Sequence, residues 1–455
     1  WRECGRKALW ADKERDALLF LYNFLLSVLF LLLLPLALVI LLLKPTLTDE
    51  LLERLGKASP GFASYLRELK KENKVIIWIN AASVGEMMMS QPIIRELIDK
   101  NDNYGYIIST NSHSGAQVAK QLFGEEKVCL LPIDLPWIVR RMAQKVQPKL
   151  TILVEFEIGP NLLRHLAKAG SKIILVNAAM DNKTVKLYSK VPGLLRDTLN
   201  RLDFIGVKSQ EERERIIALG VTPANIKATG NMKYDCRSKP LEGEERIALK
   251  KKLHIPEHKQ VLIAGSTHPG EEEIIYRVYA GLQKELKDLV LIVAPRQIER
   301  TAELKQLAAN CDLTAIERTR SASPDYNPSA GFSVIILDTI GELADLYSIA
   351  TVVFVGGSLV DQGGHNLLEP VIYHKPVLFG PYIQDFREIA EHLTTAKIGI
   401  MVRDEEDLRQ KIYTLLQDKN GLEAIAQRAR AFLEVMGGAT QRNLKVIEEF
   451  LSKSK

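Results

Sequence analysis

Residues 75–99 read VIIWINAASVGEMMMSQPIIRELID and carry the pattern of one complete α/β unit. The β-branched and aromatic run Val75–Asn80 is followed by small residues and then by Met87–Asp99, in which apolar residues recur at helical spacing. Continuous apolar strands that alternate with amphipathic helices are typical of parallel βαβ units, because helices cover both faces of such a sheet. This stretch therefore predicts a parallel sheet and an α/β fold.

The same alternation continues along the chain and pauses once, at the polar stretch Cys236–Gly243. We expect two doubly wound, Rossmann-like domains, residues 46–235 and residues 246–455 with the charged terminal helices, joined by a linker at residues 236–245. The strands expected are Val75–Asn80, Tyr106–Thr110, Val128–Leu131, Thr151–Glu155, Lys172–Asn177, Phe204–Val207, Gln260–Ala264, Val290–Ala294, Ser333–Leu337, Val352–Val355 and Pro376–Phe379. The clearest helices between them are Met87–Asp99, Ser114–Phe123 and Glu211–Leu219.

Residues 1–45 are expected to form an N-terminal extension and a membrane anchor. Leu18–Leu43 contains no charged residue, and a helix of this length reaches about 39 Å, more than the ~30 Å of a hydrocarbon core. The block is too long for the apolar region of a secretory signal and runs into Lys44-Pro45 rather than a cleavage site. Because Asn23 and Pro35 interrupt it, spanning the bilayer and inserting into one leaflet both remain open, as does a buried soluble helix.

Composition narrows the class of protein. The 455 residues are 46% hydrophobic and 26% charged, which is ordinary for a globular protein and excludes disorder for the bulk of the chain. A net charge of +5 is too small for a dedicated nucleic-acid binder. The four cysteines are far apart and form no metal-ligand spacing, which argues against disulfides and zinc and favours a reducing compartment. Taken literally, the excess of basic residues before the apolar block would place the N-terminus in the cytoplasm and the rest of the chain outside. That excess is only two charges, so the cysteines and the nucleotide chemistry described below carry more weight, and we expect the body of the protein on the cytoplasmic side of a membrane.

In doubly wound sheets, ligands bind beyond the carboxyl ends of the strands, so the loops after the strands are the candidate sites. The first of them contains Ser83, Gly85 and Glu86 and opens a helix, whose free N–H groups suit an anion. Glu86 has two interpretations: an acid that complements the helix dipole, or a catalytic base. Glu155 and Glu157 follow a later strand and are expected on one face, where mutual repulsion would raise one pKa; the alternative is a solvated strand end.

Two loops of the second half follow the first two strands there. Ser266 and Thr267 supply hydroxyl groups beside early helical amides, which suits a phosphate or sugar oxygens. His268 by itself is more often a polar loop residue than a catalyst. Arg296 follows the next strand and has the forked geometry that binds phosphates or carboxylates, although alone it is a weak signal.

The richest segment is Gly356–Pro370, in which two Gly-Gly pairs follow a strand. Glycines at such positions permit close approach of the backbone to a bulky ligand. Glu369 lies one turn into the next helix and could accept both hydroxyls of a ribose. Glycines that served only tight turns would not require His-Asn-x-x-Glu on the same helix, so the segment predicts a nucleotide site. Its candidate residues are Gly357, Ser358, Gly363, Gly364, His365, Asn366 and Glu369.

An ordered set of short motifs runs through both halves of the chain. They are Ser83-Val84-Gly85-Glu86, Leu131-Pro132-Ile133-Asp134-Leu135-Pro136, Glu155-x-Glu157-x-x-Pro160-Asn161, Thr229-Gly230-Asn231-x-Lys233, Gly265-Ser266-Thr267-His268, Gly356-Gly357-Ser358-Leu359-Val360 and Gly363-Gly364-His365-Asn366-x-x-Glu369-Pro370. Together they resemble the 3-deoxy-D-manno-oct-2-ulosonic acid (Kdo) transferases of Gram-negative lipopolysaccharide assembly. The resemblance covers roughly Leu18 to the C-terminus.

The resemblance implies a GT-B fold with the active site in the cleft between the two domains. It further implies a glycosyltransferase that moves Kdo from CMP-Kdo to a hydroxyl of a lipid A precursor (lipid IVA), with inversion and without a metal ion or other cofactor. The implied location is the inner membrane, at its inner leaflet, with the catalytic body in the cytoplasm and no nucleic-acid partner.

Roles follow from the same resemblance, residue by residue. Glu86 would be the general base, and Glu155 and Glu157 would position the sugar or the acceptor. The Gly363 and Gly364 amides with Ser266, Thr267 and Asn366 would stabilise the leaving phosphate, and Glu369 would hold the ribose. The remaining residues assigned to substrate binding are Ser83, Gly85, Asn161, His268, Arg296, Gly357, Ser358 and His365.

Three positions depart from the family pattern. Gly159 stands where Trp is common, Ala179 where Arg is common, and Gln297 where His is usual. They put the acceptor preference in doubt and keep two alternatives open. One is another GT-B sugar-nucleotide enzyme, such as a different glycosyltransferase or a 2-epimerase, although epimerases are soluble. The other is a catalytically silent, membrane-bound sugar-nucleotide binder.

Overall fold

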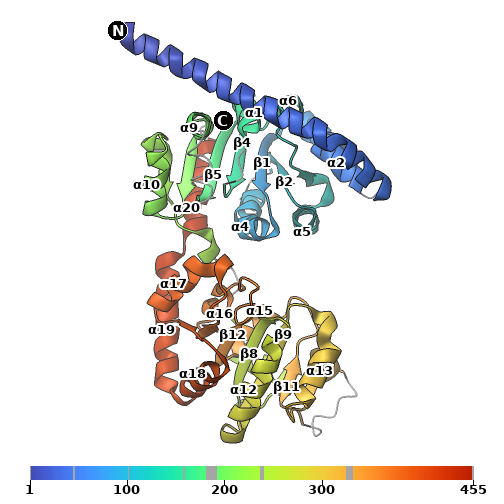
Figure 1. The fold of residues 1–455 in the computed structure, drawn as a ribbon, viewed down its shortest axis with the longest axis vertical. Coiled ribbons are helices and arrows are strands. Elements are labelled where there is room, and N and C mark those ends of the chain that lie inside the picture. Colours follow the sequence, from blue (N-terminus) through green and yellow to red (C-terminus); the bar gives the residue numbers. More distant parts are fainter. Residues whose placement is uncertain are drawn as a thin grey trace. The chain divides into compact units, whose positions relative to one another are not determined.

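The computed structural model describes residues 2–44, 47–100, 102–156, 159–180, 192–235, 240–323 and 331–452. The chain forms two compact units (Figure 1). Unit 1 consists of Trp1–Asp235 together with Gly437–Lys455, and unit 2 of Cys236–Met436. Each unit is built around its own parallel sheet.

Unit 1 contains a parallel sheet with the strand order β3-β2-β1-β4-β5-β6-β7. Its strands are β1 (Val75–Ala81), β2 (Tyr104–Thr110), β3 (Val128–Leu130), β4 (Leu150–Val154), β5 (Lys172–Ala178), β6 (Phe204–Val207) and β7 (Ile226–Ala228). The order reverses between β1 and β4, which pair along Ile77–Ala81. The carboxyl ends of these two strands therefore flank the topological switch point, where ligands bind in such folds.

Helices cover both faces of this sheet. The helices of unit 1 are α1 (Arg2–Leu43), α2 (Thr48–Arg54), α3 (Pro60–Lys71), α4 (Val84–Lys100), α5 (His113–Phe123), α6 (Pro136–Val146), α7 (Pro160–Lys168), α9 (Pro192–Leu199), α10 (Gln210–Ala218) and α20 (Ala439–Ser452). Because side chains alternate along a strand, Ile76 and Trp78 pack with α3, α6 and α7, whereas Ile77 and Ile79 pack with α4, α5 and α20. Two apolar cores thus hold the sheet rigidly between them.

The last helix departs from the expected domain limits. The sequence assigned all terminal helices to the second domain, but α20 belongs to unit 1. Its apolar face, with Leu444 and Ile447, is buried in the core beneath α4. The Asp235 carboxylate accepts hydrogen bonds from Gly438 N and Thr440 N and so caps the start of this helix. The chain therefore leaves unit 1 after Asp235 and returns to it at Gly437.

Unit 2 has the strand order β10-β11-β9-β8-β12-β13-β14, again all parallel. Its strands are β8 (Gln260–Thr267), β9 (Leu289–Pro295), β10 (Ala315–Glu317), β11 (Val334–Ile336), β12 (Val352–Val355), β13 (Val377–Phe379) and β14 (Gly399–Met401). Its helices are α11 (Glu244–Lys252), α12 (Glu271–Glu285), α13 (Thr301–Ala309), α14 (Arg318–Ser321), α15 (Leu343–Leu346), α16 (Leu368–Ile372), α17 (Arg387–Thr395), α18 (Glu405–Gln417) and α19 (Lys419–Met436). The switch point lies between β8 and β12.

The predicted architecture of two doubly wound, Rossmann-like units is confirmed, and every predicted strand is present. Three further strands, β7, β10 and β14, were not predicted. All three are short strands at a sheet edge. An edge strand has a partner on one side only, and β7 is exposed at two of its three residues, so such strands lack the continuous apolar run that marks a central one.

Candidate active site

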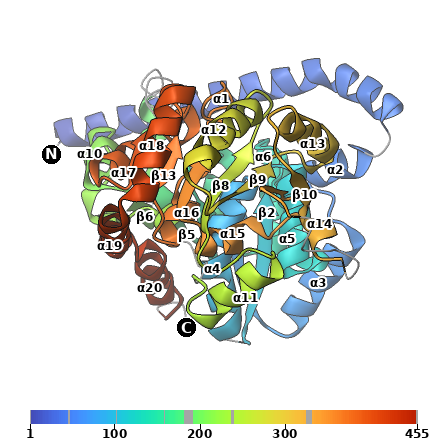
Figure 2. The same ribbon diagram turned by 90° about the horizontal axis from the view of Figure 1, so that it is seen from below.

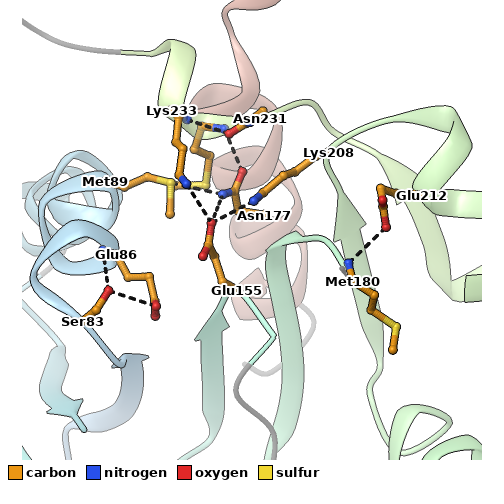
Figure 3. Close-up of polar contacts among 11 residues, drawn as sticks. Ser83, Glu86, Met89, Glu155, Asn177, Met180, Lys208, Glu212, Asn231 and Lys233 are labelled. Atoms are coloured by element: carbon orange, nitrogen blue, oxygen red, sulfur yellow. Dashed lines mark hydrogen bonds and ion pairs between the residues drawn. The ribbon is translucent and has the colours of Figure 1, made fainter. Parts of the chain in front are cut away.

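Glu86 lies in the first turn of α4, directly after β1. Its Oε2 accepts a hydrogen bond from Ala82 N at 2.7 Å, and its Oε1 accepts one from the Ser83 hydroxyl at 3.0 Å. Ser83 Oγ in turn accepts from Glu86 N at 3.3 Å, so the two side chains form a reciprocal capping arrangement (Figure 3). Gly85 lies exposed between them. The Glu86 carboxylate is thus held in one orientation at the carboxyl end of β1.

Glu155 lies beyond the end of β4 and carries a cluster of polar contacts. Its Oε1 accepts hydrogen bonds from Lys208 Nζ at 2.9 Å and from Asn177 Nδ2 at 3.1 Å, and Lys233 Nζ lies at 3.9 Å (Figure 3). These partners follow β6, end β5 and follow β7, respectively. The carboxyl ends of four neighbouring strands therefore converge on one carboxylate.

The backbone at Glu155 differs from the expectation. The strand ends at Val154, and Glu155 adopts a left-handed conformation with φ of +58°. A side chain in this conformation no longer follows the alternation of the strand, so the argument that Glu155 and Glu157 share a face does not apply. Glu157 itself lies outside the residues that the structure describes.

Asn177 links the Glu155 cluster to the helix that carries Glu86. Its Oδ1 accepts from Met232 N at 2.8 Å, and its Nδ2 contacts Met89 Sδ at 3.1 Å. Met89 lies on α4, three residues after Glu86, and Figure 3 shows its side chain extending from this helix toward Asn177. The structure therefore brings Ser83, Glu86 and Glu155 into one region. Sequence reasoning missed Asn177 and Lys208, although both stand at the carboxyl end of a strand.

Asn161 does not join this cluster. It is buried at the start of α7, where its backbone N donates to Asp134 Oδ2 at 3.0 Å and Leu162 N donates to Asp134 Oδ1 at 2.8 Å. Asp134 thus caps α7 from a distant loop, and burial raises the pKa of its carboxyl to about 6 although these hydrogen bonds oppose the shift. Gly159 makes room for it, because a Cβ there would lie 2.5 Å from Asp134 Oδ1.

In unit 2, the loop after β12 is organised around Glu271, the first residue of α12. This carboxylate is fully buried and accepts hydrogen bonds from the backbone N of Gly357, Ser358 and Leu359 at 2.7, 3.0 and 2.9 Å. A fourth comes from His268 N at 3.0 Å. The amides of Gly357 and Ser358, expected to bind substrate, are therefore occupied by an internal anion. Their hydrogen bonds to Glu271 fix the shape of the loop after β12.

Ser266 and Thr267 were both expected to offer a hydroxyl group to a ligand, and the structure distinguishes them. The Thr267 hydroxyl is buried and donates to Glu272 Oε1 at 3.0 Å, an oxygen that also accepts from Arg300. It faces inward, contrary to the expectation that it would meet a phosphate. Ser266 adopts a left-handed conformation with φ of +56° at the end of β8. In this conformation the Ser266 side chain does not follow the alternation of side chains between the two faces of the sheet.

His268 and His365 form a stacked pair, with their Nε2 atoms 2.8 Å apart and their ring centroids 5.0 Å apart. Burial, His268 and the positive charge of Arg296 together lower the pKa of His365 to about 4. Burial also lowers the pKa of His268, with Arg296 acting in the same direction. Both rings are thus neutral near pH 7, and Arg296 supplies the positive charge of this corner.

Glu369 lies on α16 close to the same corner. Asn366 Nδ2 donates to Glu369 Oε1 at 3.3 Å, while Asn366 Oδ1 accepts from Leu368 N. Burial raises the pKa of Glu369, and Asn366 and Arg296 act against that shift. In the preceding loop, the Gly364 amide donates to Gly357 O at 2.8 Å. A carboxylate, an amide, a guanidinium and an imidazole pair thus come together in unit 2.

The family of the chain follows from its similarity to known proteins. The family described as 3-Deoxy-D-manno-octulosonic-acid transferase (kdotransferase) matches residues 49–236. A 3-deoxy-D-manno-octulosonic acid transferase of Haemophilus influenzae is 31% identical over 380 residues, which is 83% of this chain and 88% of that protein. The chain belongs to the Kdo transferase family. It is therefore a glycosyltransferase.

A second relative of this Kdo transferase is longer. A bifunctional glycosyltransferase/methyltransferase of Fusobacterium nucleatum is 34% identical over 362 residues, which is 79% of this chain and 55% of that protein. The chain spans about half the length of that relative.

The fold of the Kdo transferase is shared with other sugar-nucleotide proteins. A UDP-GlcNAc 2-epimerase from Neisseria meningitidis, solved with UDP-GlcNAc, superposes with a TM-score of 0.54 over 83% of this chain and 100% of that one, at 12% sequence identity. Such a likeness shows the GT-B fold alone. Family membership rests on the transferases, which argues against the 2-epimerase alternative.

Proposed function

We propose that this Kdo transferase moves Kdo from CMP-Kdo to a hydroxyl of a lipid A precursor, with Glu86 as the general base. The observation that carries the proposal is the fixed carboxylate of Glu86 at the switch point of unit 1. Ala82 N and the Ser83 hydroxyl hold its two oxygens, so little reorientation is needed when a substrate hydroxyl arrives. Family membership supplies the sugar and the type of reaction.

In the proposed reaction, Glu86 removes the proton of the acceptor hydroxyl as its oxygen attacks the anomeric carbon of Kdo. The bond between that carbon and the phosphate oxygen of CMP breaks at the same time, so the configuration inverts and CMP leaves with the bonding electron pair. Glu86 ends the step protonated and loses its proton to solvent. A positioned base typically contributes about 10²–10⁴-fold to the rate.

The Glu155 cluster is assigned to the acceptor. Because Glu155 is ion-paired with Lys208 at 2.9 Å, we assign it to positioning this ammonium group rather than to proton transfer. Lys208 and Lys233 would then attract the phosphate groups of a lipid A precursor. This role differs from direct binding of the sugar by Glu155.

The donor is assigned to unit 2. Glu369, kept in place by Asn366, would accept the ribose hydroxyls, and Arg296 would balance the charge of the leaving phosphate beside the neutral His268–His365 pair. Gly357, Ser358 and Thr267 would act indirectly, by shaping the loops that carry these groups. Aimed charges and dipoles at a leaving group usually supply the largest catalytic contribution.

The acceptor is a lipid, which suits the apolar segment of α1. The segment Ala17–Leu43 contains an 18-residue stretch with a mean hydropathy of 3.2. We propose attachment to the inner membrane, with the two units in the cytoplasm where the sugar nucleotide is available.

The test is incubation of the protein with CMP-Kdo and a tetra-acylated lipid A precursor, followed by mass spectrometry of the lipid. We expect a mass increase of at least one Kdo with the unchanged chain and a loss of about 100-fold or more with Glu86→Gln. Glu96→Gln is the matched control, because Glu96 lies on the same helix and pairs with Lys100 on the surface. It should retain normal activity.

Two outcomes would contradict the proposal. Binding of CMP-Kdo without any transfer would identify a silent binder of the sugar nucleotide. Transfer by Glu86→Gln at a near-normal rate would remove Glu86 as the base while leaving the family assignment intact.

A further inference from the structure

The apolar helix α1 is attached to unit 1 near the start of its uncharged segment. The Tyr22 hydroxyl donates to Asp134 Oδ2 at 3.0 Å, and Asn161 Nδ2 donates to Asn23 Oδ1 at 2.6 Å. We call Tyr22, Asn23, Asp134 and Asn161 the latch. Nearby, α1 packs against α9, where Leu18 lies 3.0 Å from the position that a Cβ would take at Gly193.

The other end of the segment is also tied to unit 1. Only a short connection separates Leu43 from Thr48 at the start of α2, a reach of at most about 18 Å. Helix α2 is fixed to the body: Ile133 N donates to Arg54 O at 2.9 Å, and the Arg54 guanidinium donates to Asn111 O. Both ends of the uncharged segment therefore belong to the same folded unit.

Between its ends, α1 is covered along one side only. Its buried or half-buried residues recur every three or four positions, which is the spacing of one helical face. Among the described side chains of α1 they are Leu18, Leu19, Tyr22, Asn23, Leu26, Ser27, Phe30, Leu34, Ala37 and Leu41. The opposite face is apolar and exposed, with Leu25 57%, Leu32 71% and Leu43 77% exposed. Figures 1 and 2 both show α1 extending along unit 1 toward α2.

A helix held in this way does not cross a bilayer. From Asn23 to Leu43 it extends about 30 Å, which is the thickness of the hydrocarbon core. A spanning helix would carry Leu43 to the far side of the membrane, about 30 Å from the surface at which the latch holds Asn23. Helix α2 and its contacts with Ile133 and Asn111 would then have to break. The contacts at the two ends are compatible with one side of the membrane only.

We propose that α1 is an in-plane helix, held against unit 1 by its half-buried face and embedded in a single leaflet by its exposed apolar face. The occupant of that face is lipid, because the apolar surface continues over the whole length from Phe20 to Leu43. A lipid-facing helix of this kind inserts about 5–10 Å into the boundary between headgroups and acyl chains.

The charges on the neighbouring helices fit an anionic leaflet. Arg164 and Lys168 lie on α7, the helix whose first turn carries Asn161 of the latch, and Arg140 lies on the adjoining α6. These three cations surround His165, whose pKa is lowered by burial first and by them in addition. A cationic cluster beside an apolar helix is attracted to a surface of anionic lipid headgroups.

The in-plane position of α1 also bears on the proposed function. This step rests on the proposed function in one respect only, namely that the acceptor is a lipid. Asn161 of the latch follows Glu155 by six residues in the chain. A latch between α1 and this loop would therefore keep the Glu155 cluster close to the leaflet that holds the acceptor. The depth of α1 in the membrane is independent of whether any sugar is transferred.

The test measures that depth. Spin labels are attached to single cysteines at Leu25, Leu32 and Leu43, in a chain whose four native cysteines are replaced by alanine and which is bound to vesicles containing anionic lipid. An in-plane helix places all three labels at the same shallow depth, accessible to oxygen and poorly accessible to a polar nickel chelate. A spanning helix separates the outer two by about 27 Å along the bilayer normal and overturns the proposal.

A second measurement needs no cysteine replacement. Epitope tags at the two ends of the chain are digested in inverted inner-membrane vesicles. The proposal expects both tags to be accessible from the same side, and opposite accessibility would refute it.

The spin labels also test whether a second copy of the chain, rather than lipid, covers the apolar face. Labels at Leu25 or Leu32 that are shielded from oxygen and broadened by a second spin would show such a copy and would refute the proposal.

Latch variants complete the test. In Tyr22→Phe combined with Asn23→Ala, the label at Leu25 should become more mobile and change its depth, whereas the label at Leu43 should stay unchanged because α2 still holds that end. The control is Ser27→Ala, since the Ser27 hydroxyl donates to Asn23 O within the same helix and makes no part of the latch. Equal behaviour of all three labels in the double variant would show that the latch does not hold α1.

Discussion

Lys208 illustrates why single residues near the switch point matter more than their local sequence indicates. It is mostly buried, with 12% of its side chain exposed, and it pairs with Glu155. Lys208→Met should leave Glu155 without its nearest cation and weaken acceptor binding, with a 10- to 100-fold loss of kcat/KM expected from about 1.5–3 kcal/mol for a charged hydrogen bond. Steady-state kinetics with varied acceptor measure it. Lys227→Met on the exposed face of β7 is the control, and equal losses in both variants would contradict a specific role.

Asp134 gives the latch a pH dependence with a definite sign. Burial raises its pKa from 3.8 to about 6, so between these values the folded state binds more protons than the unfolded state. The contribution of Asp134 to stability is therefore fully present below about pH 4 and is lost as pH rises through about 6. The total is at most about 3 kcal/mol. Urea unfolding at several pH values should show this slope in the unchanged chain and its reduction in Asp134→Asn; parallel slopes would rule it out.

The same residues show how far sequence reasoning reaches. Glu155 was predicted because it directly follows a strand, and Glu86 because it lies in the first helical turn after one; the carboxyl ends of parallel strands gather at one edge. Lys208 and Asn177 obey the same rule but carry no distinctive motif, and their partner lies 53 and 22 positions away in the chain. The inward turn of the Thr267 hydroxyl toward Glu272 depends on side-chain packing. Such pairings are set by the assembled sheet, which local spacing does not encode.

At the scale of elements, the loop after β12 depends on a helix that begins 85 residues before it. Glu271→Gln would keep the shape of the side chain but replace one acceptor oxygen by an NH₂ group facing N–H donors. Two of the four hydrogen bonds would be lost, at about 1.5–3 kcal/mol each. Unfolding of unit 2 should shift by about 3 kcal/mol or more, and stabilisation by CMP should disappear. Glu273→Gln in the same turn is the control, and an unchanged CMP-induced shift in Glu271→Gln would contradict this account.

Elements differed in how well the sequence revealed them. Central strands such as β1 and β8 are buried on both faces and were predicted because burial demands a continuous apolar run; β1 extends one residue and β8 three residues beyond the predicted end. The edge strand β7 is short and mostly exposed, so it lacks that run. Helix α1 was recognised by its hydropathy alone, whereas its contacts with Asp134 and α2 required the fold. Those contacts, rather than its length, decide between spanning and in-plane insertion.

At the scale of the whole molecule, the chain returns from unit 2 to unit 1 at its end. The last helix therefore belongs to the first unit, although it follows the second unit in the sequence. Helix α20 carries an amphipathic pattern like that of α18 and α19, so no local pattern distinguishes it from them. The separation comes from Asp235, which caps α20, and from Arg442, whose Nε donates to Thr229 O at 2.7 Å. The end of the chain is thus part of the unit that carries Glu86.

This dependence leads to a prediction for truncation. A chain that ends at Met436 loses α20, and with it the burial of Leu444, Ile447 and Leu451 against the sheet of unit 1. Three such side chains contribute about 5–9 kcal/mol, comparable to the entire stability of a domain. Calorimetry in detergent should therefore show that unit 1 loses its transition while unit 2 keeps its own, and Leu444→Ala should shift the first transition by about 2–5 kcal/mol. Removal of residues 453–455 is the control. Loss of the unit 2 transition with unit 1 intact would mean that α20 stabilises the other half of the chain.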